Sequence, residues 1–356
     1  NLFWQPNSQW QVTTGLNHHY LTRSWYSSNI PEIGRDNQLL TPTNGDHPQS
    51  WGLFGQVTYQ AFKPLQLVAG LRLHQTPAYQ ARLTNHTKTP AEVTLQAEYA
   101  EDNIRVIPRV AAIWQPTAQR VFKLLYGEST IDVPLELNSF NLFYGNPLKP
   151  EQIKTLELVY TENFNWVGLT ASLFHNQLEN LIVRDIGLAD PVTHTEAATV
   201  IRNTGKDDTT GLEFTLQLPV TEKWQVEVSS SYQHTDDKLF NLPAAYSPKW
   251  LGYWKTSYHL AKGRTPPLSG RYVGEMFPLY DPVKKARIGE TVDGYFTWDA
   301  NLRWENLLMK GAFLNLRISN LLDEEIRYPV SSNNPWAVKG TLGESRAFWL
   351  GMGLKW

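Results

Sequence analysis

The sequence predicts an all-β chain that crosses a membrane as an antiparallel up-and-down β-barrel. Three observations predict this fold class. Apolar and polar residues alternate with a period of two along many segments, aromatic residues gather near the ends of these segments, and short and long connections follow one another in turn. A period of two indicates a β-strand. The other two features are typical of barrels in bacterial outer membranes.

The alternation is clearest in four segments. In Tyr295–Glu305 every second residue from Phe296 to Trp304 is apolar, and the residues between them are polar. The segments Leu65–His74, Gly211–Leu218 and Phe348–Trp356 repeat the pattern. Taken alone, the alternation also fits a large soluble β-protein that buries one face of each strand and exposes the other.

Aromatic residues lie on the apolar faces near the predicted strand ends. The chain has 14 Trp but only 19% charged residues, and no apolar run is long enough for a membrane helix. Amphipathic rings at strand ends are favoured at the interface between membrane and water. The residues in such positions are Trp51, Tyr59, Trp114, Tyr160, Trp224, Tyr232, Trp250, Trp298, Trp304 and Trp356.

The connections favour the membrane barrel over the soluble protein. Long loops are rare in compact soluble domains, whereas outer-membrane barrels have tight periplasmic turns and long extracellular loops. The predicted short connections are Gln5–Trp10, Phe62–Leu65, Gln115–Arg120, Glu162–Trp166, Pro219–Lys223, Leu260–Pro267 and Glu305–Gly311. The predicted long ones are Leu21–Ser50, Gln75–Asn103, Gly127–Gln152, His175–Thr209, His234–Lys249, Gly274–Gly294 and Asn320–Arg346.

These connections divide the chain into about fourteen strands after the turn Gln5–Trp10. Asn1–Trp4 is then the end of one more strand. Bacterial single-chain barrels have an even number of strands and both chain ends in the periplasm. We therefore expect that the first part of the barrel is missing from this chain. The alternative is that Asn1–Trp4 is not a strand and that the fourteen strands close by themselves.

Six groups of residues then follow one another in an order that resembles a known family. The segments are Ile107–Val110 with Trp114–Thr117, Gly145–Glu151 with Thr155–Leu158, Phe174–Ile182, Asn203–Lys206 with Gly211–Glu213, Ile318–Pro329, and Gly351–Trp356. Their order and spacing are similar to those in the C-terminal barrel of TonB-dependent outer-membrane receptors, over nearly the whole chain. The resemblance implies a barrel of 22 strands. It assigns residues 1–356 to the barrel region, with the N-terminal plug domain and the first strands missing.

The resemblance also implies a function. Members of this family are not enzymes; they are receptors and transporters in the bacterial outer membrane for ferric siderophores or similarly scarce nutrients. Energy comes from the TonB complex acting on a plug, which is not present in this chain. The other implied partners are outer-membrane lipid or lipopolysaccharide, and the barrel-assembly machinery, which would contact the C-terminal Trp356. The alternative is a plugless passive porin, or a structural or interaction barrel.

Haem is disfavoured as the ligand. Haem receptors of this family resemble one another in a short motif that ends in proline and is followed by a histidine. Thr130–Pro134 stands at that place, and no histidine lies between Pro134 and Asn146.

Ligand contacts are expected on the polar strand faces near the long loops, and in those loops. Arg72, His74, Arg105 and Arg109 form a predicted cationic cluster that would attract an anionic iron chelate. The alternative is that these charges form ordinary ion pairs. Loop aromatics could stack on the ligand, or could instead pack loop on loop. They are Phe143 and Tyr144, with Trp25, Tyr26, Phe140, Phe277, Tyr280 and Trp336.

Other chemistries are not predicted. The net charge of −2 gives no signal for nucleic acid. The absence of Cys excludes disulfides and thiolate metal sites. The nine His show no zinc-binding spacing and no catalytic motif is found, so no catalytic residue, metal or cofactor is assigned. Asp207–Asp208 and Asp236–Asp237 could bind calcium, although charged pairs in loops are usually solvated.

Overall fold

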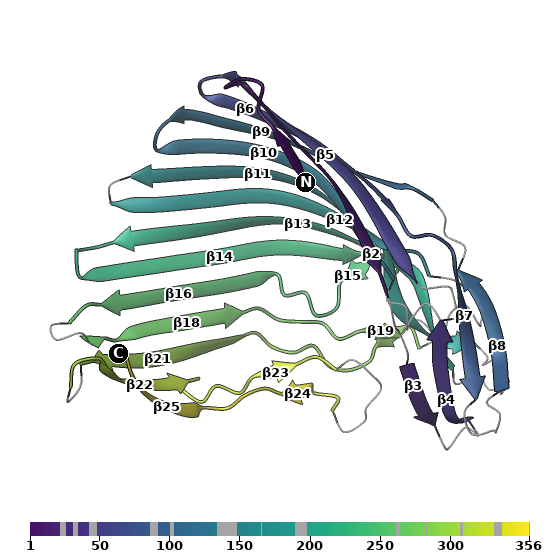
Figure 1. Cartoon of the computed structure of the whole chain (residues 1–356). Coiled ribbons are helices and arrows are strands. Elements are labelled where there is room, and N and C mark those ends of the chain that lie inside the picture. Colours follow the sequence, from purple (N-terminus) through teal and green to yellow (C-terminus); the bar gives the residue numbers. More distant parts are fainter. Residues whose placement is uncertain are drawn as a thin grey trace. The chain divides into compact units, whose positions relative to one another are not determined.

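The computed structural model of the chain consists of antiparallel β-strands joined by turns and loops (Figure 1). It describes residues 1–21, 26–30, 35–42, 48–85, 92–99, 103–133, 148–164, 166–188, 198–260, 264–281, 284–306, 309–330 and 337–355. None of the described residues belongs to a helix that is long and apolar enough to cross a membrane.

The strands are numbered in chain order. They are β1 (Leu2–Trp4), β2 (Trp10–Tyr20), β3 (Tyr26–Ile30), β4 (Arg35–Pro42), β5 (Gln49–Phe62), β6 (Leu65–Gln75), β7 (Tyr79–Asn85), β8 (Glu92–Tyr99), β9 (Arg105–Thr117), β10 (Arg120–Ile131), β11 (Glu151–Phe164), β12 (Val167–Leu188), β13 (Ala198–Pro219), β14 (Trp224–Asp237), β15 (Leu242–Pro243), β16 (Trp250–Tyr258), β17 (Arg264–Thr265), β18 (Pro267–Val273), β19 (Tyr280–Asp281), β20 (Ala286–Arg287), β21 (Tyr295–Glu305), β22 (Ala312–Ser319), β23 (Arg327–Tyr328), β24 (Thr341–Leu342) and β25 (Ala347–Leu354).

The chain forms two compact units, which are described separately below. Unit 1 comprises Asn1–Ala112, Leu125–Leu156 and Gln177–Lys206. Unit 2 comprises Ile113–Leu124, Glu157–Asn176 and Asp207–Trp356. Strands β9 to β13 contribute residues to both units, and each of them pairs with the next along the chain.

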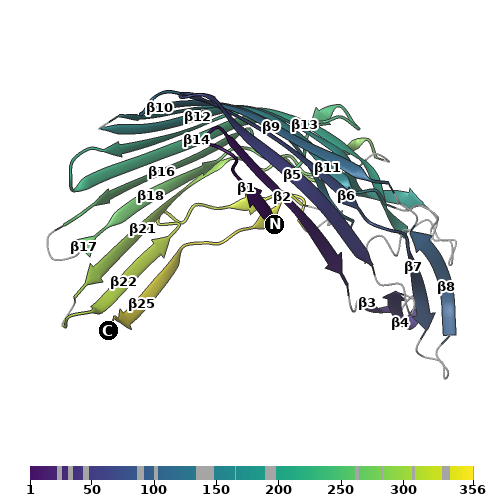
Figure 2. The ribbon, with the colours of Figure 1, turned by 45° about the horizontal axis from the view of Figure 1, so that its top comes forward.

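Unit 1 begins with a run of antiparallel hairpins. β1 pairs with β2, β2 with β5 and β5 with β6, and the three longer strands lie side by side in Figure 2. The long loops between them carry structure of their own. β3 and β4 from one loop and β7 and β8 from the next form a separate four-stranded sheet.

Unit 2 continues with β14, β16, β18, β21, β22 and β25, each antiparallel to the one before (Figures 1 and 2). Its loops enclose a small core of Val273, Met276 and Tyr295, against which Ile326 packs. We call these four residues the loop core. Val273 ends β18 and Tyr295 begins β21, so the loop core lies where these two strands meet the connection that contains Met276.

The alternation in the sequence decides which face of each strand is apolar. In β6, Leu67 and Leu71 are exposed on one face, and Arg72 and His74 lie on the other because strand side chains alternate. In β14 and β16, Tyr232 and Trp250 are both exposed, and their rings are 4.6 Å apart. Exposed apolar rows of this kind are lipid-facing in a membrane barrel, which agrees with the predicted interface aromatics.

The predicted strand count is confirmed for the described residues. The main sheet has 17 strands: β1, fourteen long strands after the turn Gln5–Trp10, and the short β15 and β17. Asn1–Trp4 does contain a strand, because Leu2 and Trp4 pair with Thr14 and Val12 of β2. Trp356, the predicted contact for barrel assembly, lies outside the described residues.

Two predicted long connections are wrong at their ends. β12 continues to Leu188 and β13 begins at Ala198, whereas His175–Thr209 was expected to be a loop. β10 likewise runs to Ile131, past the expected boundary at Gly127. Because ladder hydrogen bonds and ion pairs can hold strands together beyond the lipid, the loss of the apolar pattern does not mark the end of the strand.

Candidate functional site

The strongest candidate site is a polar cluster in unit 1, on the side of β6 opposite the exposed leucines. Arg72 donates to His74 Nδ1 at 3.3 Å, and His74 Nε2 donates to Asp132 Oδ2 at 2.9 Å. A neutral imidazole with its proton on Nε2 satisfies both contacts. His74 is 8% exposed, so this pair of hydrogen bonds fixes its ring between an arginine and an aspartate.

Arg105 joins the cluster from β9. Its guanidinium donates to Asp132 Oδ1, to Thr130 Oγ1 at 3.0 Å and to Thr76 Oγ1 at 3.2 Å. Asp132 directly follows β10, so three neighbouring strands meet at this carboxylate. The structure thus brings Arg72, His74 and Arg105 together, and the contacts of His74 and Arg105 with Asp132 are the ion pairs that the alternative interpretation expected.

Burial alone would raise the pKa of the Asp132 carboxyl. The hydrogen bond and the positive charge of Arg105, together with His74, outweigh this effect and hold the pKa below its usual range. Asp132 is therefore ionised at neutral pH. Each of its oxygens accepts a hydrogen bond from a different partner, so it orients His74 and Arg105 at once.

Arg109 lies beside this cluster in a different way. A Cβ at Gly70 would come within 2.7 Å of Arg109 Nε, so the arginine side chain lies directly across that glycine. Arg72 crosses Gly52 in the same manner, because a Cβ at Gly52 would overlap Arg72 Nη2. The two glycines leave room for arginine side chains to lie against the neighbouring strand. Within the described residues, Arg109 makes no ion pair.

A groove of about 310 Å³ opens beside Asp132 in unit 1. The cluster supplies Asp132 and Thr76 to its wall, and β2, β5 and β7 supply the other side chains. The lining residues are His19, Tyr20, Leu21, Pro48, Gln49, Ser50, Thr76, Tyr79, Asp132 and Val133. None of the three arginines lines the groove; Arg105 reaches its edge by donating to Asp132 and Thr76.

The predicted aromatic contacts have separate outcomes. Phe143 and Tyr144, like Trp25, Phe140 and Trp336, lie outside the described residues, as does the side chain of Tyr26. In unit 2, Tyr280 packs against Phe240 of another loop, with ring centroids 5.0 Å apart and the rings tilted, as the alternative interpretation expected. Phe277 lies 5.3 Å below Arg287 of its own connection.

Three of the motif segments meet in unit 1. The Asn203 side chain accepts from the Lys149 amide at 2.6 Å and donates to the carbonyls of Lys149 and Asn180, both at 2.7 Å. Glu151 Oε1 accepts from the Ile182 amide at 2.8 Å. These side chains join β12 and β13 to the segment that precedes β11. They form hydrogen bonds with backbone groups, so the motif residues hold together the strands beside the cluster.

Asp132 is a part of the site that the sequence pattern does not predict. In the sequence it lies inside the predicted long connection Gly127–Gln152, whereas β10 continues to Ile131. The signal was nevertheless present, since a lone carboxylate stands directly beyond a strand that neighbours two predicted arginines.

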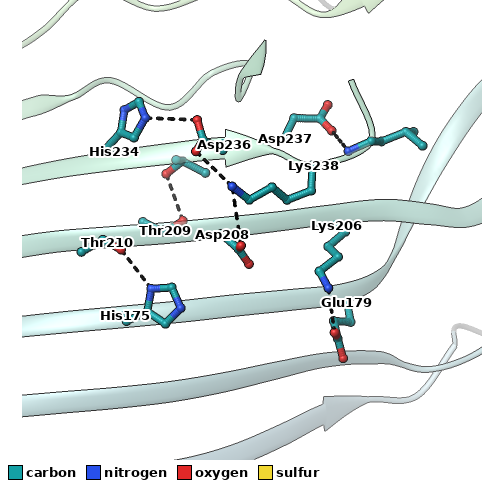
Figure 3. Close-up of polar contacts among 12 residues, drawn as sticks. His175, Glu179, Lys206, Asp208, Thr209, Thr210, His234, Asp236, Asp237 and Lys238 are labelled. Carbon is teal, nitrogen blue, oxygen red and sulfur yellow. Dashed lines mark hydrogen bonds and ion pairs between the residues drawn. The ribbon is translucent and has the colours of Figure 1, made fainter. Parts of the chain in front are cut away.

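The two aspartate pairs considered for calcium also meet, in unit 2 (Figure 3). Asp207 stands opposite Asp237 in the ladder between β13 and β14, and Asp208 stands opposite Asp236. Lys238 bridges Asp208 at 3.6 Å and Asp236 at 3.1 Å. No group of three or more His, Asp or Glu in the described part of the chain is placed to hold a metal ion.

Comparison with known families gives one match over most of the chain. Residues 1–321 match the family described as TonB dependent receptor-like, beta-barrel. A curated relative, the iron-regulated outer membrane virulence protein of Vibrio cholerae, is 30% identical over 223 residues. That alignment covers 59% of this chain and 32% of the relative, so the chain matches about a third of the relative's length.

Solved structures with the same fold include the siderophore receptor PiuA from Acinetobacter baumannii, with a TM-score of 0.69 and 16% identity. The match covers 99% of this chain and 54% of that one. The ferric yersiniabactin uptake receptor FyuA from Yersinia pestis has a TM-score of 0.66 and 14% identity, with coverage of 98% and 50%. At these identities the likeness shows the fold alone, and the chain spans about half the length of these proteins.

Proposed function

The chain belongs to the TonB-dependent receptor-like β-barrel family of the bacterial outer membrane, and from this premise we propose that it takes part in the uptake of a ferric siderophore or a similar anionic iron chelate. The family consists of receptors and transporters. Transport would be driven by the TonB complex acting on a plug domain that is not among these 356 residues.

The cationic cluster is the observation that carries this proposal. Arg105 contacts Asp132 directly and Arg72 contacts it through His74, whereas Arg109 lies across Gly70 on the same polar side of the sheet. A ferric tris-catecholate is a trianion, whereas a ferric tris-hydroxamate is neutral. A surplus of guanidinium groups beside a groove attracts the trianion, so we propose the anionic class of chelate as the ligand.

The names of the relatives support the same ligand class. The curated relative is iron-regulated, and two solved structures of the same fold are a siderophore receptor and a receptor for ferric yersiniabactin. A third is described as a copper transporter. Iron chelates are therefore the favoured cargo, and the charge of the cluster selects among them.

Direct binding tests this proposal. The full protein, purified in detergent, is titrated with a ferric tris-catecholate and with a ferric tris-hydroxamate. We expect the anionic chelate to bind more tightly, and we expect added salt to weaken its binding because the interaction is electrostatic. Equal binding of the two chelates, with no effect of salt, would contradict the proposed role of the cluster.

A growth experiment separates iron uptake from a passive pore. A strain that lacks the gene is grown with each chelate as its sole iron source. Loss of growth on the catecholate alone is the expected result. If iron uptake is unchanged while small solutes cross the outer membrane more slowly, a passive barrel is the correct interpretation.

A further inference from the structure

The imidazole ring of His74 stands between Arg72 and Asp132 in the polar cluster of unit 1. Arg72 and His74 are two positions apart in β6, so their side chains share a face. Arg72 donates to Nδ1 of the ring at 3.3 Å, and Nε2 donates to Asp132 Oδ2 at 2.9 Å. The two contacts use different nitrogens of one ring, which therefore separates the guanidinium from the carboxylate.

The donors and acceptors of the ring match its two neighbours. A neutral imidazole has one N–H donor and one acceptor nitrogen. Asp132 takes the donor, and the Arg72 guanidinium occupies the acceptor. Because His74 is 8% exposed, these two protein groups fix the position of the ring.

Arg72 and Arg105 differ in how their charges are compensated. Arg105 forms an ion pair with the Asp132 carboxylate. The groups that hold the pKa of Asp132 below its usual range are Arg105 and His74, and Arg72 is not one of them. In the part of the chain that the structure describes, Arg72 forms no ion pair. Its positive charge is therefore the less compensated of the two.

Asp132 would capture Arg72 if the ring were absent. Arg105 donates to Oδ1 and His74 donates to Oδ2, so loss of the imidazole would leave Oδ2 without this donor. A carboxylate oxygen and a guanidinium form a strong charge-assisted hydrogen bond. The long Arg72 side chain starts on the same face and can cross the space that the ring fills. Asp132 would then hold two guanidinium groups.

We propose that His74 is a positioning residue that keeps Arg72 from pairing with Asp132, so that the Arg72 guanidinium stays available to an anionic ligand. His74 acts through Arg72 and not by touching the ligand. Its side chain is not among the described residues that line the groove beside Asp132. The effect on chelate binding rests on the proposed function, whereas the placement of Arg72 does not.

A chemical probe tests the placement of Arg72 without any ligand. Phenylglyoxal modifies arginine side chains, and an arginine that is paired with a carboxylate reacts more slowly. Peptide mapping by mass spectrometry follows the reaction of Arg72 in the full protein, purified in detergent. We expect Arg72 to react several times more slowly in His74→Leu than in wild type. Equal rates in the two proteins would overturn the proposal.

Titration with a ferric tris-catecholate measures the consequence for binding. His74→Leu should bind about tenfold more weakly, since the ligand loses one charged hydrogen-bond donor. His74→Gln should restore most of the affinity, because an amide offers an acceptor to Arg72 and a donor to Asp132. His175→Leu is the matched control. It removes a histidine that hydrogen-bonds Thr210 of a neighbouring strand at 2.9 Å, and it should bind as wild type does.

The Asp132→Asn background separates positioning from a purely structural role. Without the carboxylate nothing captures Arg72, so the Asp132→Asn/His74→Leu double variant should match Asp132→Asn in chelate affinity and in phenylglyoxal reactivity. If His74→Leu lowers affinity equally with and without the carboxylate, the proposal is wrong. If wild type fails to bind the chelate while the reactivity of Arg72 changes as expected, the proposed function fails and the positioning role stands.

Discussion

Two arginines, Arg72 in unit 1 and Arg287 in unit 2, use the same side chain for different purposes. Arg287 donates to the carbonyls of Pro278 at 2.9 Å and Pro243 at 2.6 Å, and it lies over the Phe277 ring. Among the described residues, Arg72 donates to His74 Nδ1 at 3.3 Å. Arg287 donates to backbone carbonyls, whereas Arg72 donates to a side chain of the candidate site.

The surroundings of the two arginines explain this difference. Arg287 lies among the loops of unit 2, where Tyr246 also donates to the Val330 carbonyl at 2.8 Å and joins loops that are distant in sequence. Burial lowers the pKa of the Arg287 guanidinium, and the charge of Asp237 opposes this effect in part. The two carbonyl contacts of Arg287 join the connection that follows β18 to the segment around β15. The cation cluster of unit 1 is instead open to a groove, which is what a ligand site requires.

The largest expected effect is on chelate binding by the arginines of unit 1. Replacing Arg72 and Arg105 together by Gln should weaken binding of a ferric tris-catecholate about a hundredfold, since a hydrogen bond to a charged group contributes about 1.5–3 kcal/mol. Isothermal titration of the purified protein measures the loss. Lys63→Gln, in the turn between β5 and β6 at the far end of the same hairpin, is the matched control and should bind as wild type does. An unchanged affinity in the double variant would remove the cluster from the binding site.

The second effect is on the stability of the loops of unit 2. Arg287→Met keeps the length of the side chain but leaves the Pro278 and Pro243 carbonyls without their donor. We expect a loss of about 2 kcal/mol, the cost of unsatisfied buried acceptors. Limited proteolysis should then cut the loops of unit 2 faster, while chelate affinity changes little. If affinity fell as much as it does in the arginine double variant, the contrast between the two arginines would be wrong.

How well the sequence predicts these two regions depends on how far apart the contacting residues are along the chain. Alternation in segments such as Leu65–His74 predicts the strands and places Arg72 and His74 on the polar face. The pairing of Arg105 with Asp132 joins residues 27 apart, and no local pattern encodes it. The approach of Arg109 to Gly70 depends on strand register. The loop core is also hidden from the sequence, because Ile326 comes from a different connection than Met276 and packs against it only in the fold.

A smaller effect is expected from the glycine beneath Arg72. Gly52→Ala places a methyl group where Arg72 Nη2 and Asn17 Oδ1 now lie, so the guanidinium must shift. The loss should amount to about one hydrogen bond, which lowers chelate affinity between about twofold and tenfold. Gly55→Ala is the matched control in the same strand, because a Cβ there meets no atom within 4 Å. Both variants are measured by the same titration. Equal affinities would show that Arg72 needs no such space.

The smallest effect concerns Asp207, which stands opposite Asp237 in the ladder between β13 and β14. The apolar lipid-facing row of β13 runs from Leu212 to Leu218, so Asp207 lies on its loop side, outside the membrane-spanning part. Burial, followed by the charges of Asp237 and Asp208, raises the pKa of Asp207 from 3.8 to about 6. The folded state therefore keeps a proton that the unfolded chain releases, and stability falls as the pH rises from about 4 to about 6.

Asp207→Asn removes this penalty. A fully buried carboxyl with this shift would cost about 3 kcal/mol, and solvent screening at this half-exposed site reduces the cost to about 1 kcal/mol. The variant should therefore unfold at a higher temperature than wild type at pH 7.5 and at the same temperature at pH 4, as followed by circular dichroism in detergent. Asp236→Asn is the control of opposite sign, because Lys238 and His234 hold the pKa of Asp236 below its usual range, so its removal should destabilise at pH 7.5. If Asp207→Asn destabilised the protein at that pH, the Asp207 carboxylate would have a favourable partner and the two carboxylates would not simply repel.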